Sequence, residues 1–258
     1  MLNRTLIAAL LASAAFAGTA QAQTVAALVG DDTLAMVDVK AAKVAKSMKI
    51  SGASGKIVGI DVRPADGMLY ALAVDGTLYT VDAAGKATQK SKLEKTLADG
   101  VIGTVDFNPV ADRLRVIGSD GTNLRVNVED GKVTTDGKLS FAEKDMHKGE
   151  MPKIVAGAYT NSMKGAKETV LFDVDATIGA LIKQTPPNDG VLNAVGKFGV
   201  TASSYAFDIA TMGDKNEGYL MAGDTLYTVS LETGKTTMVA KIAGVTGAVR
   251  DIAVMPAM

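Results

Sequence analysis

Residues 57–88, IVGIDVRPADGMLYALAVDGTLYTVDAAGKAT, align with residues 102–134, IGTVDFNPVADRLRVIGSDGTNLRVNVEDGKVT, as two copies of one pattern. Each copy contains short runs rich in valine, isoleucine, leucine, threonine and tyrosine. Asp-Gly pairs, which tolerate the positive φ of tight hairpins, separate many of these runs. The pairs begin at Asp66, Asp75, Asp99, Asp120, Asp130, Asp136 and Asp189. The pattern predicts a series of β-hairpins.

The same unit returns at a regular spacing along the chain. Weaker copies occupy residues 154–184 and 204–237. The equivalent positions are Asp61, Asp106, Ala158 and Asp208, which are 45, 52 and 50 residues apart. Repeats of about 40 to 50 residues with four strands each are typical of β-propeller blades.

A fifth copy is divided between the two ends of the chain. Residues 248–258 supply one strand, with Asp251 at the equivalent position, and residues 24–50 supply the other three. Pairing the last strand with the N-terminal strands closes the ring and removes exposed edges. We therefore predict an all-β fold, a five-bladed β-propeller closed by pairing the C-terminal strand with the N-terminal blade. A β-sandwich or an open β-solenoid is the alternative, but neither needs the chain ends to complete one repeat.

Residues 1–22 have the pattern of an export signal. Arg4 precedes an apolar run from Leu6 to Phe16, and the segment ends in Ala20-Gln21-Ala22, the small residues that a signal peptidase requires. The apolar run is too short to span a bilayer. We expect a mature protein that begins near Gln23, is periplasmic or secreted, and consists of a single propeller domain over residues 23–258.

Composition excludes several classes of function. The chain has no cysteine, which excludes disulfides and thiolate metal sites, and its one histidine makes a Ser-His-Asp set or an imidazole metal site implausible. The formal net charge is −1, so no basic field attracts nucleic acid or an anionic membrane. No later segment is apolar for long enough to span a membrane. We also expect the protein to be a monomer.

The first strand of each blade lines the tunnel, so equivalent side chains form a ring around the axis. Asp61, Asp106, Asp208 and Asp251 occupy this ring, and Ala158 interrupts it. Two carboxylates about 6 Å apart repel by roughly 2.8 kcal/mol at an effective dielectric near 20. Three forms of compensation stay open, namely backbone N–H donors from the adjoining blade, shared protons, or a bound cation such as Ca²⁺.

Two arginines stand where other blades have aromatic rings. Arg115 aligns with Tyr70, and Arg125 aligns with Tyr79 and Tyr227. A buried arginine needs a carboxylate partner, and Asp106, Asp112 and Asp120 are near enough in sequence to be candidates. The arginines either form structural ion pairs between blades or build an anion pocket at a tunnel mouth. The candidate ligand-binding residues are Arg113, Arg115, Arg125, Asn108 and Asn123, with Tyr159 and Asn161 from the divergent third copy.

The run DFNPVADRLRVIGSDGTNLRVN, residues 106–127, resembles a bacterial exported family catalogued as domain of unknown function 4394. GIDVRPADGMLYAL before it, and AYTNS and QTPPNDGVLNAVGKFGV after it, extend the resemblance over nearly the whole mature chain. The resemblance implies an exported all-β repeat protein and carries over no catalytic residue.

These observations favour a non-enzymatic binding protein for a small polar ligand, an ion or a protein partner at the tunnel mouth. One alternative is a Ca²⁺-assisted hydrolase of the lactonase type, in which the aspartate ring holds the cation. A structural scaffold of the cell envelope is another. Whether the protein is an enzyme stays open at this stage, and the only cofactor that the sequence suggests is Ca²⁺.

Overall fold

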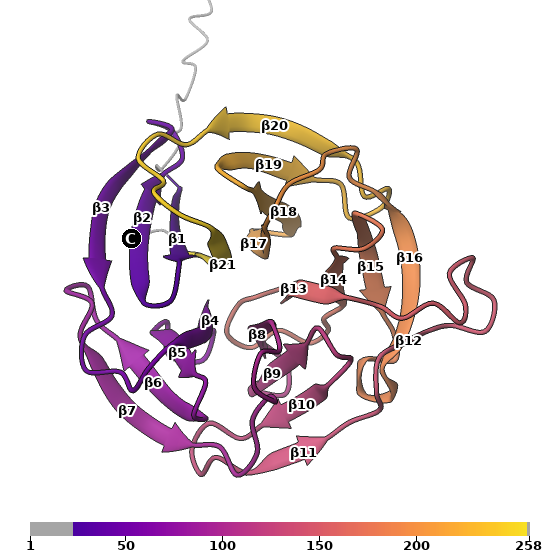
Figure 1. The fold of residues 1–258 in the computed structure, drawn as a ribbon, viewed down its shortest axis with the longest axis horizontal. Helices are drawn as coiled ribbons and strands as arrows, with labels where there is room; N and C mark the ends of the chain where they lie inside the picture. Colours follow the sequence, from indigo (N-terminus) through magenta and orange to yellow (C-terminus); the bar gives the residue numbers. More distant parts are fainter. Residues whose placement is uncertain (1–22, 257–258) are drawn as a thin grey trace, which may run out of the picture.

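The computed structural model describes residues 23–256. These residues form five separate sheets arranged in a ring around one axis (Figure 1). The five-bladed β-propeller predicted from the repeats is therefore confirmed. The predicted signal peptide, residues 1–22, lies outside the described residues.

Each blade is built on four antiparallel strands, with the first of them innermost. Blade 1 contains β21 (Val249–Val254), β1 (Thr24–Val29), β2 (Thr33–Asp38) and β3 (Lys43–Lys49). Blade 2 contains β4 (Ile57–Val62), β5 (Leu69–Ala73), β6 (Thr77–Val81) and β7 (Ala87–Lys92). Blade 3 contains β8 (Gly103–Asn108), β9 (Arg113–Gly118), β10 (Asn123–Val126) and β11 (Val133–Thr135).

Blades 4 and 5 complete the ring. Blade 4 contains β13 (Ile154–Tyr159), β14 (Leu171–Asp175), β15 (Ala180–Gln184) and β16 (Val191–Lys197), and the short strand β12 (Ser140–Phe141) pairs with β16 in parallel. A single 3₁₀ turn, η1 (Pro187–Asp189), connects β15 to β16. Blade 5 contains β17 (Tyr205–Met212), β18 (Lys215–Ala222), β19 (Thr225–Val229) and β20 (Thr236–Lys241).

The two ends of the chain meet in blade 1. Strand β21 pairs antiparallel with β1, so that Val25 lies opposite Val254 and Ala27 lies opposite Ile252. This pairing confirms the predicted closure, in which the last strand becomes the innermost strand of the first blade.

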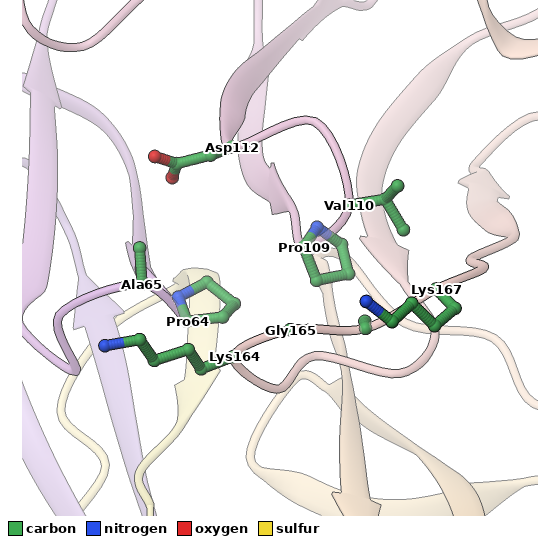
Figure 2. Close-up of a pocket in the computed structure, with 9 residues that line it drawn as sticks. Pro64, Ala65, Pro109, Val110, Asp112, Lys164, Gly165 and Lys167 are labelled. Atoms are coloured by element: carbon green, nitrogen blue, oxygen red, sulfur yellow. The ribbon is translucent and has the colours of Figure 1, made fainter.

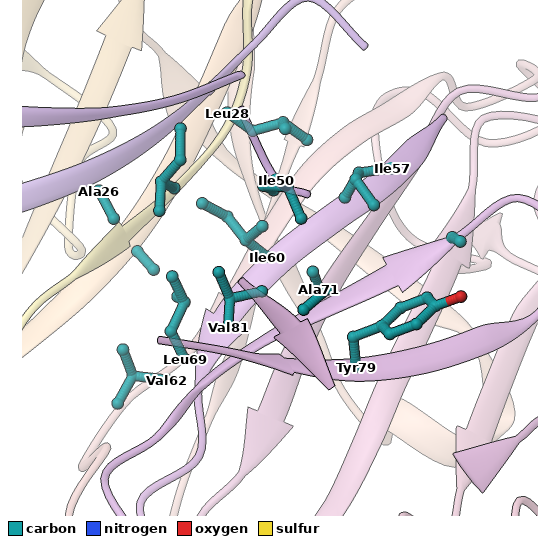
Figure 3. Packing of buried hydrophobic residues seen from close by; sticks show 14 residues of the cluster. Ala26, Leu28, Ile50, Ile57, Ile60, Val62, Leu69, Ala71, Tyr79 and Val81 are labelled. Atoms are coloured by element: carbon teal, nitrogen blue, oxygen red, sulfur yellow. The ribbon is translucent and has the colours of Figure 1, made fainter. Parts of the chain in front are cut away.

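The core lies between neighbouring blades. Inner strands contact another blade on each side, and β4 and β13 are buried at every position, in keeping with their largely apolar sequences. Figure 3 shows one cluster, in which Leu28 of blade 1 packs with Ile60 and Val81 of blade 2. The outer strands β3 and β20 are mostly exposed.

One end of the tunnel is formed by the hairpins that join each inner strand to the second strand of its blade. Because all blades repeat one topology around the axis, these hairpins gather at the same end, which we call the hairpin mouth. They are residues 63–68, 109–112, 160–170 and 213–214 of blades 2 to 5. Within residues 23–256, no helix is long and apolar enough to cross a membrane.

Candidate functional site

Four aspartates line the axis, and each accepts a hydrogen bond from a backbone N–H of a neighbouring inner strand. The pairs are Asp61 with Phe107 (2.7 Å), Asp106 with Tyr159 (3.0 Å), Asp251 with Ile60 (3.0 Å) and Asp208 with Val254 (2.5 Å). We call these contacts the axial latches, because each joins one blade to the next. Three of the carboxylates also accept a bond from the N–H of the following residue. Backbone donors, one of the three expected forms of compensation, are therefore present.

The axial carboxylates stand on two levels. Asp61, Asp106 and Asp208 each place one oxygen so that the three atoms lie within 4.8 Å of one another. Asp251 reaches the N–H of Ile60, one residue before Asp61. Its carboxylate is therefore lower on the axis, which means farther from the hairpin mouth. At that level Gly59 makes room, since a Cβ there would lie 2.4 Å from the Asp251 carboxylate.

Burial governs the protonation of these groups. It raises the pKa of Asp61, with a further rise from the negative charge of Asp208. Burial and the charge of Asp61 likewise raise the pKa of Asp106. The pKa of Asp208 rises to about 6 through burial, although N–H donors act against the change. The three carboxyls therefore retain protons at a higher pH than exposed aspartates do.

The three upper carboxylates, those of Asp61, Asp106 and Asp208, also have the donor chemistry of a hard-cation site. Carboxylate oxygens suit Ca²⁺, whose ligands lie about 2.3–2.6 Å from the ion, and oxygens within 4.8 Å of one another can surround such an ion. Within residues 23–256, the one oxygen of this set without an N–H donor is Oδ2 of Asp106. The residues therefore fit a cation in size and in donor type, whereas five of their six oxygens already accept backbone N–H bonds.

The junction between blades 4 and 5 has no axial latch from Ala158, which replaces the ring aspartate. A polar pair at the hairpin mouth connects these two blades instead. The backbone N–H of Asn161 donates to Oδ1 of Asn216 at 2.7 Å, and the side-chain amide of Asn216 donates to Oδ1 of Asn161 at 2.8 Å. Asn161 has a positive φ of 56°, a conformation that asparagine tolerates better than most residues.

Arg115 lies between blades 3 and 4 and is 2 % exposed. All three guanidinium nitrogens donate hydrogen bonds to protein groups. The acceptors are Tyr159 Oη (3.1 Å), Asn123 Oδ1 (2.8 Å), Asp136 Oδ2 (2.6 Å) and Asn188 Oδ1 (2.8 Å). Three predicted ligand-binding residues, Arg115, Asn123 and Tyr159, thus come together, and their contacts join two blades.

Asp136 is the carboxylate partner of both predicted arginines. Arg125 grips it with two N–H groups, at 2.7 and 3.0 Å, while Arg115 approaches the same side chain. Burial acts to raise the pKa of Asp136, but the hydrogen bonds from Arg125 and Arg115 leave it below its usual value. The prediction that Asp106, Asp112 or Asp120 is the partner of these arginines is therefore wrong. Asp136 follows β11 and reaches both side chains because β10 and β9 pair Arg125 with Arg115.

The remaining predicted residues lie at the hairpin mouth. Asn108 accepts N–H bonds from Val110 and Ala111, both at 2.9 Å, and so shapes the hairpin of blade 3. Arg113 donates to the carbonyls of Ala111 and Asp112 in the same hairpin. Arg113 does not join the Arg115 cluster, whereas the Asn108 side chain lies at its edge, beside the Tyr159 hydroxyl.

A pocket of about 310 Å³ opens at the hairpin mouth, where the hairpins of blades 2, 3 and 4 converge (Figure 2). Pro64 and Ala65 come from the first hairpin, and Pro109, Val110 and Asp112 come from the second. Lys164, Gly165, Ala166 and Lys167 belong to the third. The third copy, which diverges most in sequence, supplies the lysines of this pocket.

Hydrogen bonds between residues of the same hairpin fix the shape of the hairpin that carries these lysines. Val170 donates its N–H to Thr160 Oγ1 at 2.8 Å, and the Thr169 hydroxyl donates to the Thr160 carbonyl at 2.6 Å. The amide of Asn161 donates to the Glu168 carbonyl at 3.0 Å. The base of the hairpin is thus fixed on the blade.

Comparison with protein families identifies the chain. The sequence profile of the family described as Domain of unknown function (DUF4394) matches residues 33–253. The chain belongs to this family. The resemblance seen in the repeat motifs of blades 2 to 4 is therefore confirmed. The match also covers all of blade 5, and in blade 1 it begins at β2 and ends at the penultimate residue of β21. No protein with a curated description shows significant similarity to the chain.

One solved structure with a TM-score above 0.5 shares the fold of this family member, and two others show a weaker similarity. A protein of unknown function from Bacteroides thetaiotaomicron VPI-5482 is 15% identical, with a TM-score of 0.53, and the match covers 93% of this chain and 68% of the other. One of unknown function from Bacteroides caccae is 15% identical, with a TM-score of 0.44, covering 85% and 73%. An auxiliary nutrient binding protein from B. thetaiotaomicron is 12% identical, with a TM-score of 0.47, covering 76% and 52%. At 15% identity, the first of these similarities shows the fold alone.

Sequence reasoning did not single out Arg63, which is buried at the junction of blades 2 and 3. Its guanidinium donates to both oxygens of Asp112, at 2.8 and 2.6 Å, and to Glu129 at 3.0 Å. Hydrogen bonding to Asp112 is the largest cause that raises the pKa of Arg63. The available signal was its position directly after an inner strand, where Asn108 is the counterpart in blade 3.

Proposed function

We propose that this member of the family is a binding protein that takes a small polar ligand into the pocket at the hairpin mouth. The observation that carries the proposal is the convergence of three hairpins on a cavity of about 310 Å³. This volume is at the lower end of the roughly 300–1,000 Å³ found for small-molecule sites. Its walls combine apolar surface with a few charged groups, which is the usual composition of such sites.

The lining groups are suited to binding rather than to reaction. Asp112 is the one carboxylate in the lining, and both of its oxygens accept hydrogen bonds from Arg63. That pairing lowers the pKa of Asp112, which makes it a poor proton acceptor. Lys164 and Lys167 are exposed, so nothing desolvates them as an amine nucleophile requires.

We also propose that the protein acts outside the cytoplasm, on the strength of the export pattern in residues 1–22. N-terminal sequencing of the protein recovered from a periplasmic or culture fraction should read from a residue near Gln23. An intact Met1 on protein confined to the cytoplasm would remove this part of the proposal.

Ligand-observed NMR with mixtures of small polar metabolites tests the binding function. Signals that broaden with the wild type should recover their width with Ala65→Phe, because a ring at this lining position occupies space that the ligand would need. Ala84→Phe is the matched control, since Ala84 lies exposed in the turn between β6 and β7, outside the pocket lining. Binding that is equal in all three proteins would place the ligand elsewhere.

A second candidate function is cation-assisted hydrolysis, which the convergence of Asp61, Asp106 and Asp208 favours. A cation there would polarise a carbonyl or activate water. This function requires Ca²⁺ to raise the melting temperature of chelator-treated protein, with a smaller gain in Asp106→Asn. The measurement belongs at about pH 8, since the pKa of Asp208 is about 6 and a cation needs ionised ligands. An unchanged melting temperature eliminates this candidate.

A further inference from the structure

We propose that the ligand of the hairpin-mouth pocket is a small organic anion with an apolar body, such as an aliphatic carboxylate. The inference rests on the proposed binding function and deepens it by assigning the chemical class of the ligand. The anionic group would lie between Lys164 and Lys167, and the apolar part would lie on the walls from blades 2 and 3.

The charges in the pocket lining favour an anion. Lys164 and Lys167 are both exposed, and within residues 23–256 neither forms a salt bridge or a side-chain hydrogen bond. The opposing charge of Asp112 is already compensated by the two-pronged contact with Arg63. An incoming anion therefore meets two unpaired ammonium groups and no unpaired carboxylate in the lining.

The remaining walls favour an apolar body. Pro64, Ala65, Pro109 and Val110, which line the pocket from blades 2 and 3, carry only apolar rings and methyl groups (Figure 2). Removing apolar surface from water contributes about 25 cal/mol per Å². These walls therefore stabilise a bound aliphatic chain and do not stabilise a bound inorganic ion. Charge and apolar surface together define the class.

Exposed apolar side chains continue around the same mouth. Met68, Val110 and Met163 lie on the hairpins of blades 2 to 4, Met212 ends β17 next to the hairpin of blade 5, and all four are exposed. Methionine is flexible and polarisable, and it adapts to ligands of varied shape. A chain that extends beyond the pocket would thus find further apolar contacts.

The lysine-bearing hairpin is ordered before a ligand arrives. Contacts of Thr160 with Thr169 and Val170 close its base, and Asn161 ties it to Asn216 of blade 5. Binding to a preorganised loop loses less conformational entropy. Lysine suits this role because its ammonium group acts as a compact charge and does not demand the planar geometry that arginine does.

A head-group series tests the inference. Hexanoate, hexylammonium and hexanol share one apolar chain and differ in charge, while acetate and inorganic phosphate are anions without that chain. Titration into the full mature protein should show binding of hexanoate and much weaker binding of the other four probes. The double variant Lys164→Met, Lys167→Met should weaken hexanoate binding about tenfold, as two exposed ion pairs of about 0.7 kcal/mol each imply.

The control is Lys197→Met, which removes an exposed lysine at the end of β16, far from the hairpin mouth. It should leave hexanoate affinity unchanged. Equal binding of hexanol, hexylammonium and hexanoate, all abolished by Ala65→Phe, overturns the anion assignment but keeps the binding function. Hexanoate affinity that survives the double lysine variant also overturns it. If neither the series nor the metabolite mixtures contain any molecule whose binding depends on Ala65, both proposals are overturned.

Discussion

The two faces of blade 4 meet their neighbours in different ways. Toward blade 5 the contact is apolar and aromatic, with Phe172 of blade 4 and Phe207 of blade 5 in one buried cluster. Toward blade 3 the contact contains Arg115, whose guanidinium donates four hydrogen bonds to acceptors from both blades. One repeat unit thus accommodates a mainly apolar junction on one side and a junction with a buried charge on the other.

The contacts along the axis also differ between the two sides of blade 4. Asp106 of blade 3 latches the N–H of Tyr159 in blade 4, whereas Ala158 offers no carboxylate to blade 5. The Asn161 and Asn216 pair takes over at the hairpin mouth. Buried polar contacts contribute less net stability than apolar ones of equal size, but they fix geometry and leave large penalties when one partner is removed. Substitution of polar residues should therefore change the free energy of unfolding far more at the face of blade 4 toward blade 3 than at the face toward blade 5.

The largest effect is expected from Arg115→Leu. This change leaves the acceptors on Asn123, Tyr159 and Asn188 without their charged donor, and it leaves Asp136 with Arg125 alone. Breaking a buried ion pair typically costs about 3–5 kcal/mol. We expect the free energy of unfolding in urea to fall by about 3 kcal/mol, with or without ligand.

Arg113→Leu is the control for this prediction. Arg113 contacts only carbonyl groups of its own hairpin among the described residues, so its loss should change the unfolding free energy by less than about 0.5 kcal/mol. Unchanged stability in Arg115→Leu, combined with lost ligand binding, would contradict the structural role and support an anion pocket around Arg115.

The architecture could be predicted because each copy of the repeat carries its own local information. Asp-Gly turns and apolar runs mark the strands, and the fragment that ends at Val254 is recognisable as the missing inner strand of blade 1. The need of Arg115 for a buried partner also followed from sequence, because its counterpart Tyr70 marks a core position. Local pattern and period thus sufficed for the fold.

The identity of contacts between blades could not be predicted in the same way. Asp136 lies beyond the outer strand of blade 3, and Asn188 lies in the turn after β15, so their approach to Arg115 depends on the twist and tilt of two sheets. The lower level of Asp251 likewise reflects the position of β21 along the axis, which alignment of repeats does not encode. The pocket combines three hairpins of unequal length, which the repeat pattern leaves unspecified.

A smaller effect of opposite sign is expected from Asp173→Asn, at the same polar face of blade 4. Asp173 is 0% exposed, and within residues 23–256 neither of its oxygens has a hydrogen-bond partner. Burial raises the pKa of Asp173 well above 3.8, although the charge of Arg115 acts against the rise. A raised pKa contributes stability that is present below about pH 3.8 and is lost as pH increases through the folded-state value. Asparagine does not titrate, so this loss of stability with pH does not occur in the variant. The free energy of unfolding of Asp173→Asn should exceed that of the wild type by about 1–3 kcal/mol at pH 8 and by little at pH 4.

Asp175→Asn on the same strand is the matched control, because the oxygens of Asp175 already accept N–H bonds from Thr177, Ile178 and Lys153. Weakening these bonds should lower the unfolding free energy by about 1 kcal/mol. Urea unfolding of the three proteins at several pH values separates the cases, and the axial aspartates contribute equally to all of them. A difference between Asp173→Asn and the wild type that is constant from pH 4 to pH 8 would show that the Asp173 carboxyl does not titrate in this range. The two faces of blade 4 would then differ in packing and not in the cost of a buried charge.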